Sequence, residues 1–180
     1  MKRNLFYLAA ITAFAVMLLL FTPGERSTQD SAADALLLAD VAARINDVNR
    51  VEIISGGNTV VATMQRSGGH WQLEEMGGYQ ADWSRLQSML AALAQARVIE
   101  TKTDKPDYYA RLGVENIDAE DAGSVLVRLS IADETTAVLV GNRAQGRTGQ
   151  YVRLQNEAAS VLVDREIDVS PEQLDWADSR

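Results

Sequence analysis

The stretch RSGGHWQLEEMGGYQADW, residues 66–83, contains the signals for two turns, a strand and the start of a helix. Glycine pairs at 68–69 and 77–78 predict the turns, because glycine adopts backbone angles that other residues avoid. The residues between the pairs, 70–75, have the pattern of a strand. Asp82 predicts the N-cap of a helix, since its carboxylate can accept a hydrogen bond from a backbone N–H of the first turn. We interpret the stretch as turn, strand, turn and helix start.

The strand within this stretch places its side chains alternately on two faces. Trp71 and Leu73 share one face, which we expect to be the core face, and His70 lies on the other. His70 is the only histidine of a chain without cysteine, so it lacks the partners that a metal site or a catalytic triad needs. We therefore interpret His70 as an exposed polar residue, and we predict neither a metal site nor a catalytic residue.

The segments on both sides of this stretch follow strand and helix patterns. Upstream, RVEIIS (50–55) and NTVVATMQR (58–66) are rich in β-branched residues and are separated by glycines, which predicts a hairpin. Further upstream, a capping pattern and helical spacing predict a helix over 31–47. Downstream, residues 83–98 predict the most regular helix of the chain. The apolar stripe of this helix consists of Trp83, Leu86, Leu90 and Leu93.

The last part of the chain is dominated by strands. Proline in the first turn and glycine at the end predict a short helix over 104–113. A second short helix, capped by Ser170, is predicted over 170–178. The predicted strands are 98–103, 124–131, 136–141, 151–154 and 160–163. Strands that follow one another in meanders predict an α+β fold, with antiparallel strands and a few packed helices.

Residues 1–22 form the most apolar part of the sequence. Lys2 and Arg3 precede 17 uncharged residues, Leu5 to Phe21, and as a helix these reach about 26 Å, near the short end of what spans a bilayer. We interpret them as an uncleaved single-pass anchor; the alternatives are a cleaved signal peptide, which normally has a shorter apolar run, and a buried core helix. The basic residues favour a cytoplasmic N-terminus, which predicts a bacterial inner-membrane protein whose C-terminal domain lies in the periplasm.

A short polar linker over 23–30 precedes the expected extracytoplasmic domain, residues 31–180. Beyond residue 22 the chain carries 15 basic and 25 acidic residues, a net charge of −10. Such a domain is not expected to bind nucleic acid or anionic lipid through its overall field. The lack of cysteine excludes disulfides, lipoprotein processing and thiolate chemistry.

The loop GNRAQGRTG, residues 141–149, is the strongest candidate for a contact with a partner or an anion. Arg143 and Arg147 bring positive charge to an acidic domain, and the glycines let the backbone approach a bound anion. Arg153, in the strand that follows, is the third candidate. The alternative is that the loop only connects two strands. Neither a G-x-G-x-x-G pattern nor a P-loop lysine occurs, so we predict no cofactor.

Four segments together resemble a known family. They are NDVNRVEI, GGHWQL, GGYQADWSRLQSMLAALAQARVIETKTDKPDYYARLGVE and VGNRAQGRTGQYVRL. Over about residues 45–164 the chain resembles the domain-of-unknown-function family 4340, and the most specific segment is KTDKPDYYARLGV; Gln80 departs from the pattern, which has proline at this position. The resemblance implies a membrane-anchored bacterial protein that faces outward, and some members occur with components of ABC-type export systems linked to gliding motility. It supplies no catalytic residues.

These observations favour a single-pass membrane protein whose periplasmic domain is a non-enzymatic accessory or binding module, with transporter subunits as its expected partners. One alternative is a hydrolase that uses carboxylates such as Asp82, Glu115 or Asp118, which requires at least two acids to converge in an enclosed pocket. Another alternative is a structural spacer. The sequence leaves the oligomeric state, the identity of the partner and any ligand open.

Overall fold

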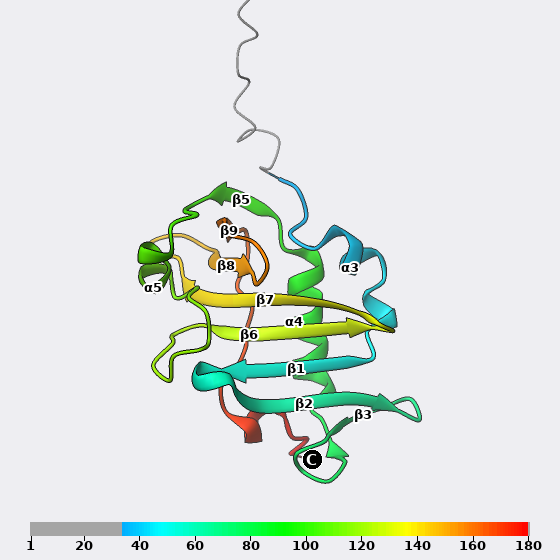
Figure 1. Ribbon diagram of the computed structural model, residues 1–180. Coiled ribbons are helices and arrows are strands. Elements are labelled where there is room, and N and C mark those ends of the chain that lie inside the picture. The colour runs from blue at the N-terminus through cyan, green and yellow to red at the C-terminus, as the bar shows by residue number, and fades with distance from the viewer. Residues whose placement is uncertain (1–33, 180) are drawn as a thin grey trace, which may run out of the picture. The chain divides into compact units, whose positions relative to one another are not determined.

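Within residues 34–179, which the computed structural model describes, nine strands form one antiparallel sheet (Figure 1). The strands are β1 (Arg50–Ser55), β2 (Thr59–Ser67), β3 (His70–Leu73), β4 (Tyr79–Gln80), β5 (Val98–Thr101), β6 (Val125–Ile131), β7 (Glu134–Arg143), β8 (Gln150–Leu154) and β9 (Ser160–Val163). Their order across the sheet is β4-β3-β2-β1-β6-β7-β8-β9-β5. Together with the helices below, this confirms the expected α+β class and the antiparallel strands.

The expected anchor over 1–22 and the linker over 23–30 lie outside the described residues. Ser31, the expected cap of the first helix, also lies outside them. No helix of residues 34–179 combines the length and the apolar character needed to cross a membrane.

The two groups of strands predicted from the sequence are joined into one sheet by β1 and β6. Val51 pairs with Leu129, and Ile53 pairs with Val127; all four side chains are buried in the core. The predicted glycine turn between β1 and β2 is confirmed as a 3₁₀ turn, η2 (Gly56–Asn58). The short β4 was not predicted, because its glycine-rich segment was interpreted as a turn; it pairs with β3.

Helix α4 (Trp83–Gln95) packs across one face of the sheet, behind the strands in Figure 1. Asp82 is its N-cap, as predicted, because the Asp82 carboxylate accepts a hydrogen bond from the backbone N–H of Arg85 at 3.1 Å. The buried side chains of α4 are Leu86, Met89, Leu90 and Leu93. The prediction for Trp83 is wrong, since this side chain is 48% exposed. It lies at the flank of the buried stripe, on the same side of the helix as Gln87.

The helix predicted over 31–47 is largely wrong. Its described part contains only α3 (Ala39–Ala43) and a 3₁₀ turn, η1 (Ile45–Asp47). The backbone of residues 34–37 pairs instead with the segment that leads into β5, where the N–H of Asp34 donates to the carbonyl of Val98 at 2.7 Å. Asp34 also has a φ of 75°, which lies in the left-handed region and is incompatible with a right-handed helix.

The short helix predicted over 104–113 is confirmed. It consists of η3 (Pro106–Tyr108) followed directly by α5 (Tyr109–Leu112). Proline opens its first turn, and Gly113 ends it with a φ of 66°, which glycine adopts without strain. Its two tyrosines differ, because Tyr109 is buried whereas Tyr108 is 43% exposed.

The helix predicted over 170–178 is shorter than expected. It is a single 3₁₀ turn, η4 (Gln173–Trp176), with Glu172 at its N-cap. Ser170 precedes the cap, and its hydroxyl donates to the carboxylate of Asp175 at 2.6 Å. Its hydroxyl also accepts a hydrogen bond from the N–H of Glu172 at 3.1 Å, so Ser170 contacts the turn without being its N-cap residue.

The end of the described chain covers the edge of the sheet at β4. Trp176 is 0% exposed, and its carbonyl accepts a hydrogen bond from the backbone N–H of Asp82 at 2.8 Å. The N–H of Asp178 donates to the carbonyl of Gln80 at 2.9 Å. These bonds lie on the side of β4 away from β3, so β4 does not present an open edge.

Candidate functional site

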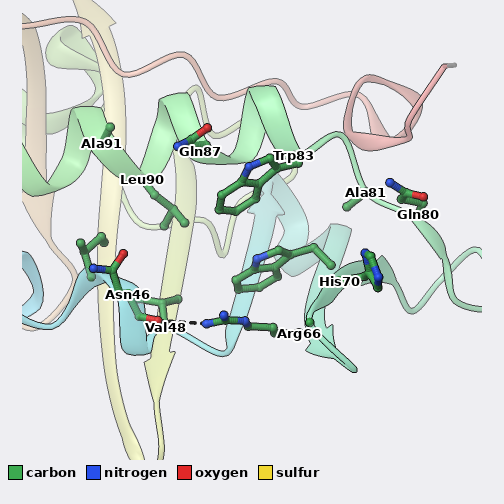
Figure 2. A pocket seen from close by; sticks show the side chains of 13 residues that line it. Asn46, Val48, Arg66, His70, Gln80, Ala81, Trp83, Gln87, Leu90 and Ala91 are labelled. Atoms are coloured by element: carbon green, nitrogen blue, oxygen red, sulfur yellow. Dashed lines mark hydrogen bonds between the residues drawn. The ribbon is translucent and has the colours of Figure 1, made fainter.

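A groove of about 650 Å³ lies between α4, the β2–β3 hairpin and η1 (Figure 2). It is lined by Ile45, Asn46, Val48, Arg66, Gly69, His70, Trp71, Gln80, Ala81, Trp83, Gln87, Leu90 and Ala91. We call it the α4 groove. Its volume falls within the range of ligand sites, about 300–1,000 Å³.

The floor of the α4 groove is the end of the β2–β3 hairpin. Arg66 of β2 lies directly opposite Trp71 of β3, so both side chains share one face of the sheet. On the same face, the next residues along the two strands, Met64 and Leu73, are 0% exposed in the core. The hairpin thus carries the core face outward beyond the packed interior, and there Arg66 is exposed.

One wall of the groove is the flank of α4. Trp83, Gln87 and Ala91 are spaced four residues apart and form a stripe along the helix. This stripe lies beside the buried one, and Leu90 belongs to both. In Figure 2 the side chains of Trp83 and Leu90 reach from α4 towards the hairpin. The half-exposed indole of Trp83 therefore offers apolar surface to a ligand.

The opposite wall comes from η1 and the residues after it. The guanidinium of Arg66 donates from Nη1 to the backbone carbonyl of Asn46 at 3.0 Å (Figure 2). Val48, which is 1% exposed, fixes this wall to the core. The bond to Asn46 therefore holds the cation of the hairpin at a defined place in the groove.

The α4 groove combines aromatic, amide and cationic side chains and has no carboxylate among its lining residues. Arg66 is the only lining residue that carries a charge when His70 is neutral. Gln80, Gln87 and Asn46 each have an amide group that both donates and accepts hydrogen bonds. The lining also has no serine, cysteine or lysine that could act as a nucleophile. This composition suits the binding of a ligand by apolar contact and hydrogen bonds.

The sequence pattern of residues 66–83 indicates structural elements alone and does not predict the groove. Seven of the thirteen lining residues come from this stretch. His70 is among them and is exposed, as predicted. A usable signal is present in α4: Gln87, four residues after Trp83, places a polar side chain next to the tryptophan, which indicates that Trp83 lies at the edge of the apolar stripe.

The three arginines predicted as a partner or anion contact have different environments. Arg143 forms an ion pair with Glu166 at 3.3 Å, and Arg147 forms one with Glu100 at 3.0 Å. Hydrogen bonds from Lys102 and from Arg147 lower the pKa of Glu100. All these groups lie at the surface, where an ion pair contributes about 0–1 kcal/mol to stability.

Arg153, the third of them, is buried, with 4% of its surface exposed. Its guanidinium lies over the ring of Tyr109, 4.3 Å from the ring centroid. Nε donates to the carbonyl of Val114 at 2.9 Å, Nη1 to the carbonyl of Glu157 at 3.0 Å, and Nη2 to Oδ1 of Asn116 at 2.6 Å. Burial lowers the pKa of Arg153, but an arginine remains charged. This side chain connects β8 to the segments around it and acts as a structural residue.

The three carboxylates of the hydrolase alternative lie on two different elements. Asp82 caps α4. Glu115 and Asp118 belong to the loop between α5 and β6, where Glu115 accepts a hydrogen bond from the N–H of Gly123 at 2.6 Å and Asp118 is exposed. Among residues 34–179, no three histidine, aspartate or glutamate side chains are grouped so as to hold a metal ion.

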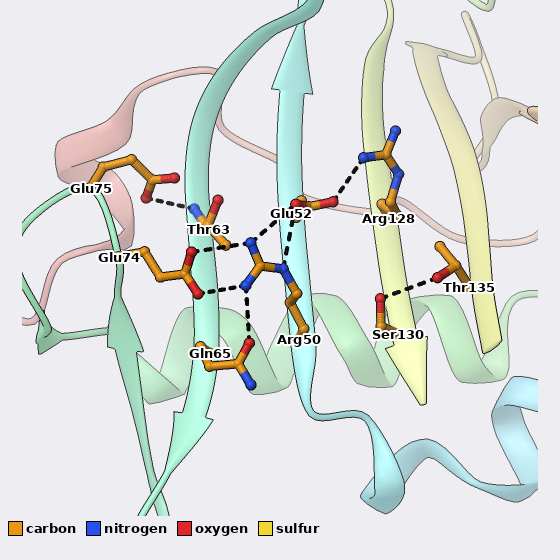
Figure 3. A network of polar contacts seen from close by, with 9 residues as sticks. All are labelled: Arg50, Glu52, Thr63, Gln65, Glu74, Glu75, Arg128, Ser130 and Thr135. Carbon is orange, nitrogen blue, oxygen red and sulfur yellow. Dashed lines mark hydrogen bonds and ion pairs between the residues drawn. The ribbon is translucent and has the colours of Figure 1, made fainter. Parts of the chain in front are cut away.

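The face of the sheet opposite α4 carries a network of charged side chains (Figure 3). Glu52 accepts hydrogen bonds from Arg128 at 2.8 Å and from Arg50 at 3.3 Å. Arg50 also pairs with Glu74, and the hydrogen bond that its guanidinium donates to the Glu74 carboxylate raises the pKa of Arg50. Its Nη1 further donates to Gln65 at 3.1 Å. The charges of Arg50, Arg128, Glu52 and Glu74 are therefore balanced within the chain, which distinguishes them from the cation of the α4 groove.

The family described as Domain of unknown function (DUF4340) matches residues 71–180. The match includes α4, α5 and the strand with Arg153, and it begins after Arg66. No curated protein and no solved structure matches the chain significantly. The matched residues make up more than half of the chain, so the resemblance to the family is confirmed, and the segment NDVNRVEI lies before the matched range. The chain belongs to the DUF4340 family.

Proposed function

We propose that this chain is a single-pass inner-membrane protein whose periplasmic domain, residues 31–180, is a non-enzymatic binding module. The α4 groove is the surface through which it binds a partner. The observation that carries this proposal is Trp83, which is 48% exposed at the wall of a groove of about 650 Å³. The anchor over residues 1–22 rests on the uninterrupted apolar run in the sequence.

The lining of the groove supports binding. Tryptophan and arginine are enriched among the residues that dominate the energy of protein interfaces, and the groove holds Trp71, Trp83 and Arg66. A hairpin and a helix that are both packed into the core carry these side chains. The site is therefore formed before a partner arrives, which lowers the entropic cost of binding.

We further propose that the partner is a subunit of an ABC-type transport system. The support is the family resemblance, because some members occur with components of such export systems. An accessory subunit needs a binding surface and a fixed position at the membrane, and it needs no catalytic centre. The α4 groove and the proposed anchor supply these two requirements.

A photo-cross-linking amino acid at Gln87 tests the proposal. Gln87 is exposed and lines the groove, so the substitution leaves the core unchanged. Thr135 is the control position, because it is also exposed and lies with the charged network on the other face of the sheet (Figure 3). Intact cells that contain the full chain are irradiated, the membranes are solubilised, and the adducts are identified by mass spectrometry.

We expect Gln87 to form an adduct with a transporter subunit and Thr135 to form none. No adduct at Gln87, or the same adducts at both positions, contradicts the groove as the binding surface. An adduct with a protein unrelated to transport supports the binding module and rejects the transporter as its partner.

The proposed orientation has a separate test. A reporter enzyme that is active only outside the cytoplasm is fused after Arg180 of the full chain. We expect activity, because the basic residues before the apolar run favour a cytoplasmic N-terminus. A reporter that is produced but inactive, while a cytoplasmic reporter at the same place is active, contradicts the periplasmic location.

A further inference from the structure

We propose that the occupant of the α4 groove is an extended acidic segment of the partner protein. The inference rests on the proposed function and names the chemistry that the groove recognises. An apolar side chain of the segment packs against the indoles of Trp71 and Trp83. An aspartate or glutamate of the same segment binds the guanidinium of Arg66.

The first argument for an acidic occupant is the positive charge of Arg66. Among residues 34–179, eight arginines form ion pairs with an aspartate or glutamate of the chain. Arg66 pairs with no carboxylate in this part of the chain, and its Nη1 donates to the neutral carbonyl of Asn46. With Arg66 counted, the chain beyond residue 22 carries a net charge of −10, so a carboxylate is attracted by the local charge of Arg66 and not by the overall field of the domain. A guanidinium that the domain itself does not neutralise favours a carboxylate from outside.

The surroundings of Arg66 reinforce this step. None of the thirteen lining residues is acidic. Two carboxylates are flanked directly by lining residues in sequence: Asp82 is engaged with the N–H of Arg85, and Asp47 is exposed on η1 and is not part of the lining. An approaching carboxylate therefore meets Arg66, the amide groups and the indoles, and it meets no like charge within the groove.

The neutral part of the lining favours a peptide. Gln80, Gln87 and Asn46 carry amide groups, which both donate and accept hydrogen bonds. A peptide backbone also offers a donor and an acceptor at each residue, so it can bond to such groups along its length. Trp83 and Leu90 supply the apolar surface of the lining.

The dimensions favour an extended segment. The stripe from Trp83 to Ala91 covers eight steps of α4, which is about 12 Å along the helix. An extended chain advances about 3.3 Å per residue, so about four residues match the wall. Alternate side chains of such a segment point to the same side, which allows one apolar and one acidic residue to enter the groove.

The inference is tested with two synthetic peptides and the purified full chain in detergent. One peptide of eight residues has leucine and aspartate in turn at every second position, with serine between them, so that both kinds of side chain lie on one side of the extended chain. Its counterpart has asparagine in place of every aspartate. The dissociation constants are measured by fluorescence anisotropy at physiological ionic strength, where salt screens the repulsion between the acidic peptide and the negative charge of the domain. We expect the asparagine peptide to bind at least about tenfold more weakly, because it cannot form the charge-assisted bond to Arg66.

Four variants assign the binding to the groove. Arg66→Gln is expected to weaken the aspartate peptide by about tenfold and to remove the difference between the two peptides. Gln87→Lys is expected to tighten, and Gln87→Glu to weaken, binding of the aspartate peptide by about threefold each. Arg111→Gln is the control: within residues 34–179 Arg111 is also an exposed arginine without a carboxylate partner, but it lies on α5 and not in the groove.

Several outcomes overturn the inference. Equal binding of the two peptides, unchanged binding by Arg66→Gln, or equal losses in Arg66→Gln and Arg111→Gln each show that Arg66 does not recognise the acid. If the molecule cross-linked at Gln87 is a saccharide and not a protein, the inference of an acidic peptide segment is also overturned. If Gln87 still captures a transporter subunit but the cross-linked segment has no excess of aspartate and glutamate, the acidic segment is wrong and the proposed function stands. If no protein is captured, the proposed function fails with it.

Discussion

Replacing Arg153 by leucine is expected to destabilise the domain by about 2–4 kcal/mol. The side chain is 4% exposed, and its guanidinium binds three acceptors and one aromatic ring. Leucine keeps much of the apolar stem but has no donor. The substitution therefore removes every polar contact of this position while leaving its surroundings filled.

The magnitude follows from what each partner does after the substitution. The carbonyl of Val114 lies in the interior, and an acceptor left without a donor there costs about 1–3 kcal/mol. Asn116 and Glu157 are exposed, so water replaces the guanidinium at little cost. The lost contact with the ring of Tyr109 adds about 1–2 kcal/mol. Part of this total is returned, because burial disfavours the charge of Arg153 and lowers its pKa.

Urea and thermal unfolding of the full chain in detergent, followed by circular dichroism and tryptophan fluorescence, measure the effect. Arg143→Leu is the control, since the Arg143 side chain is 61% exposed and its ion pair is expected to contribute less than about 1 kcal/mol. Arg153→Lys is expected to lie between the wild type and Arg153→Leu, because one ammonium group cannot reach three separated acceptors. If Arg153→Leu unfolds like the wild type, Arg153 is not a structural anchor and returns to being a candidate contact.

Three further predictions concern other parts of the fold. Gly141→Ala is expected to cost about 1–3 kcal/mol, because a Cβ there would lie 2.6 Å from the carbonyl oxygen of the residue that caps α5; an unchanged urea midpoint would contradict this close approach. Hydrogen bonds from Arg165 lower the pKa of Asp164 in the folded chain. The ionised Asp164 therefore stabilises the fold fully above its unfolded pKa of about 3.9, and this stabilisation is lost as the pH falls through the lower pKa of the folded state. Asp164→Asn should flatten this part of the stability profile, and identical profiles for both chains would refute the coupling. Trp176 is 0% exposed, and its replacement by alanine is expected to lower the free energy of unfolding by about 3–5 kcal/mol. Alanine at the half-exposed Trp83 is expected to lower it by less than about 1 kcal/mol. Similar thermal midpoints for the two variants would contradict the effect of their difference in burial.

Elements whose determinants lie within a few residues were predictable from the sequence. Asp82 predicts the start of α4 because the cap and the N–H that it accepts from are three residues apart. Gly113 predicts the end of α5 because the left-handed φ at that place favours glycine. The alternation in β6 predicts that Val127 and Leu129 face the core, and both are buried. In each case the local pattern and the tertiary packing agree.

Elements that depend on distant partners were not predictable in this way. Residues 34–37 have helical spacing, but their backbone pairs with a segment about sixty residues away in sequence. The two residues of β4 form a strand because β3 pairs with one side and the C-terminal segment covers the other. The sequence makes Arg153 a candidate contact, and its acceptors come from segments that only the fold brings together. The α4 groove was missed for the same reason, since three separate segments form it.

Membership of the DUF4340 family explains the fold of this chain better than its binding specificity. The most specific family segment, KTDKPDYYARLGV, contains Tyr109 and ends at Val114, and these residues enclose the guanidinium of Arg153. The segment that identifies the family therefore builds an interior cluster. The α4 groove takes Arg66 and the whole η1 wall from residues before the matched range of 71–180. The charge that we propose as the basis of recognition thus belongs to this chain and does not follow from the family match, so binding measured on Arg66→Gln, rather than family membership, decides what the groove recognises.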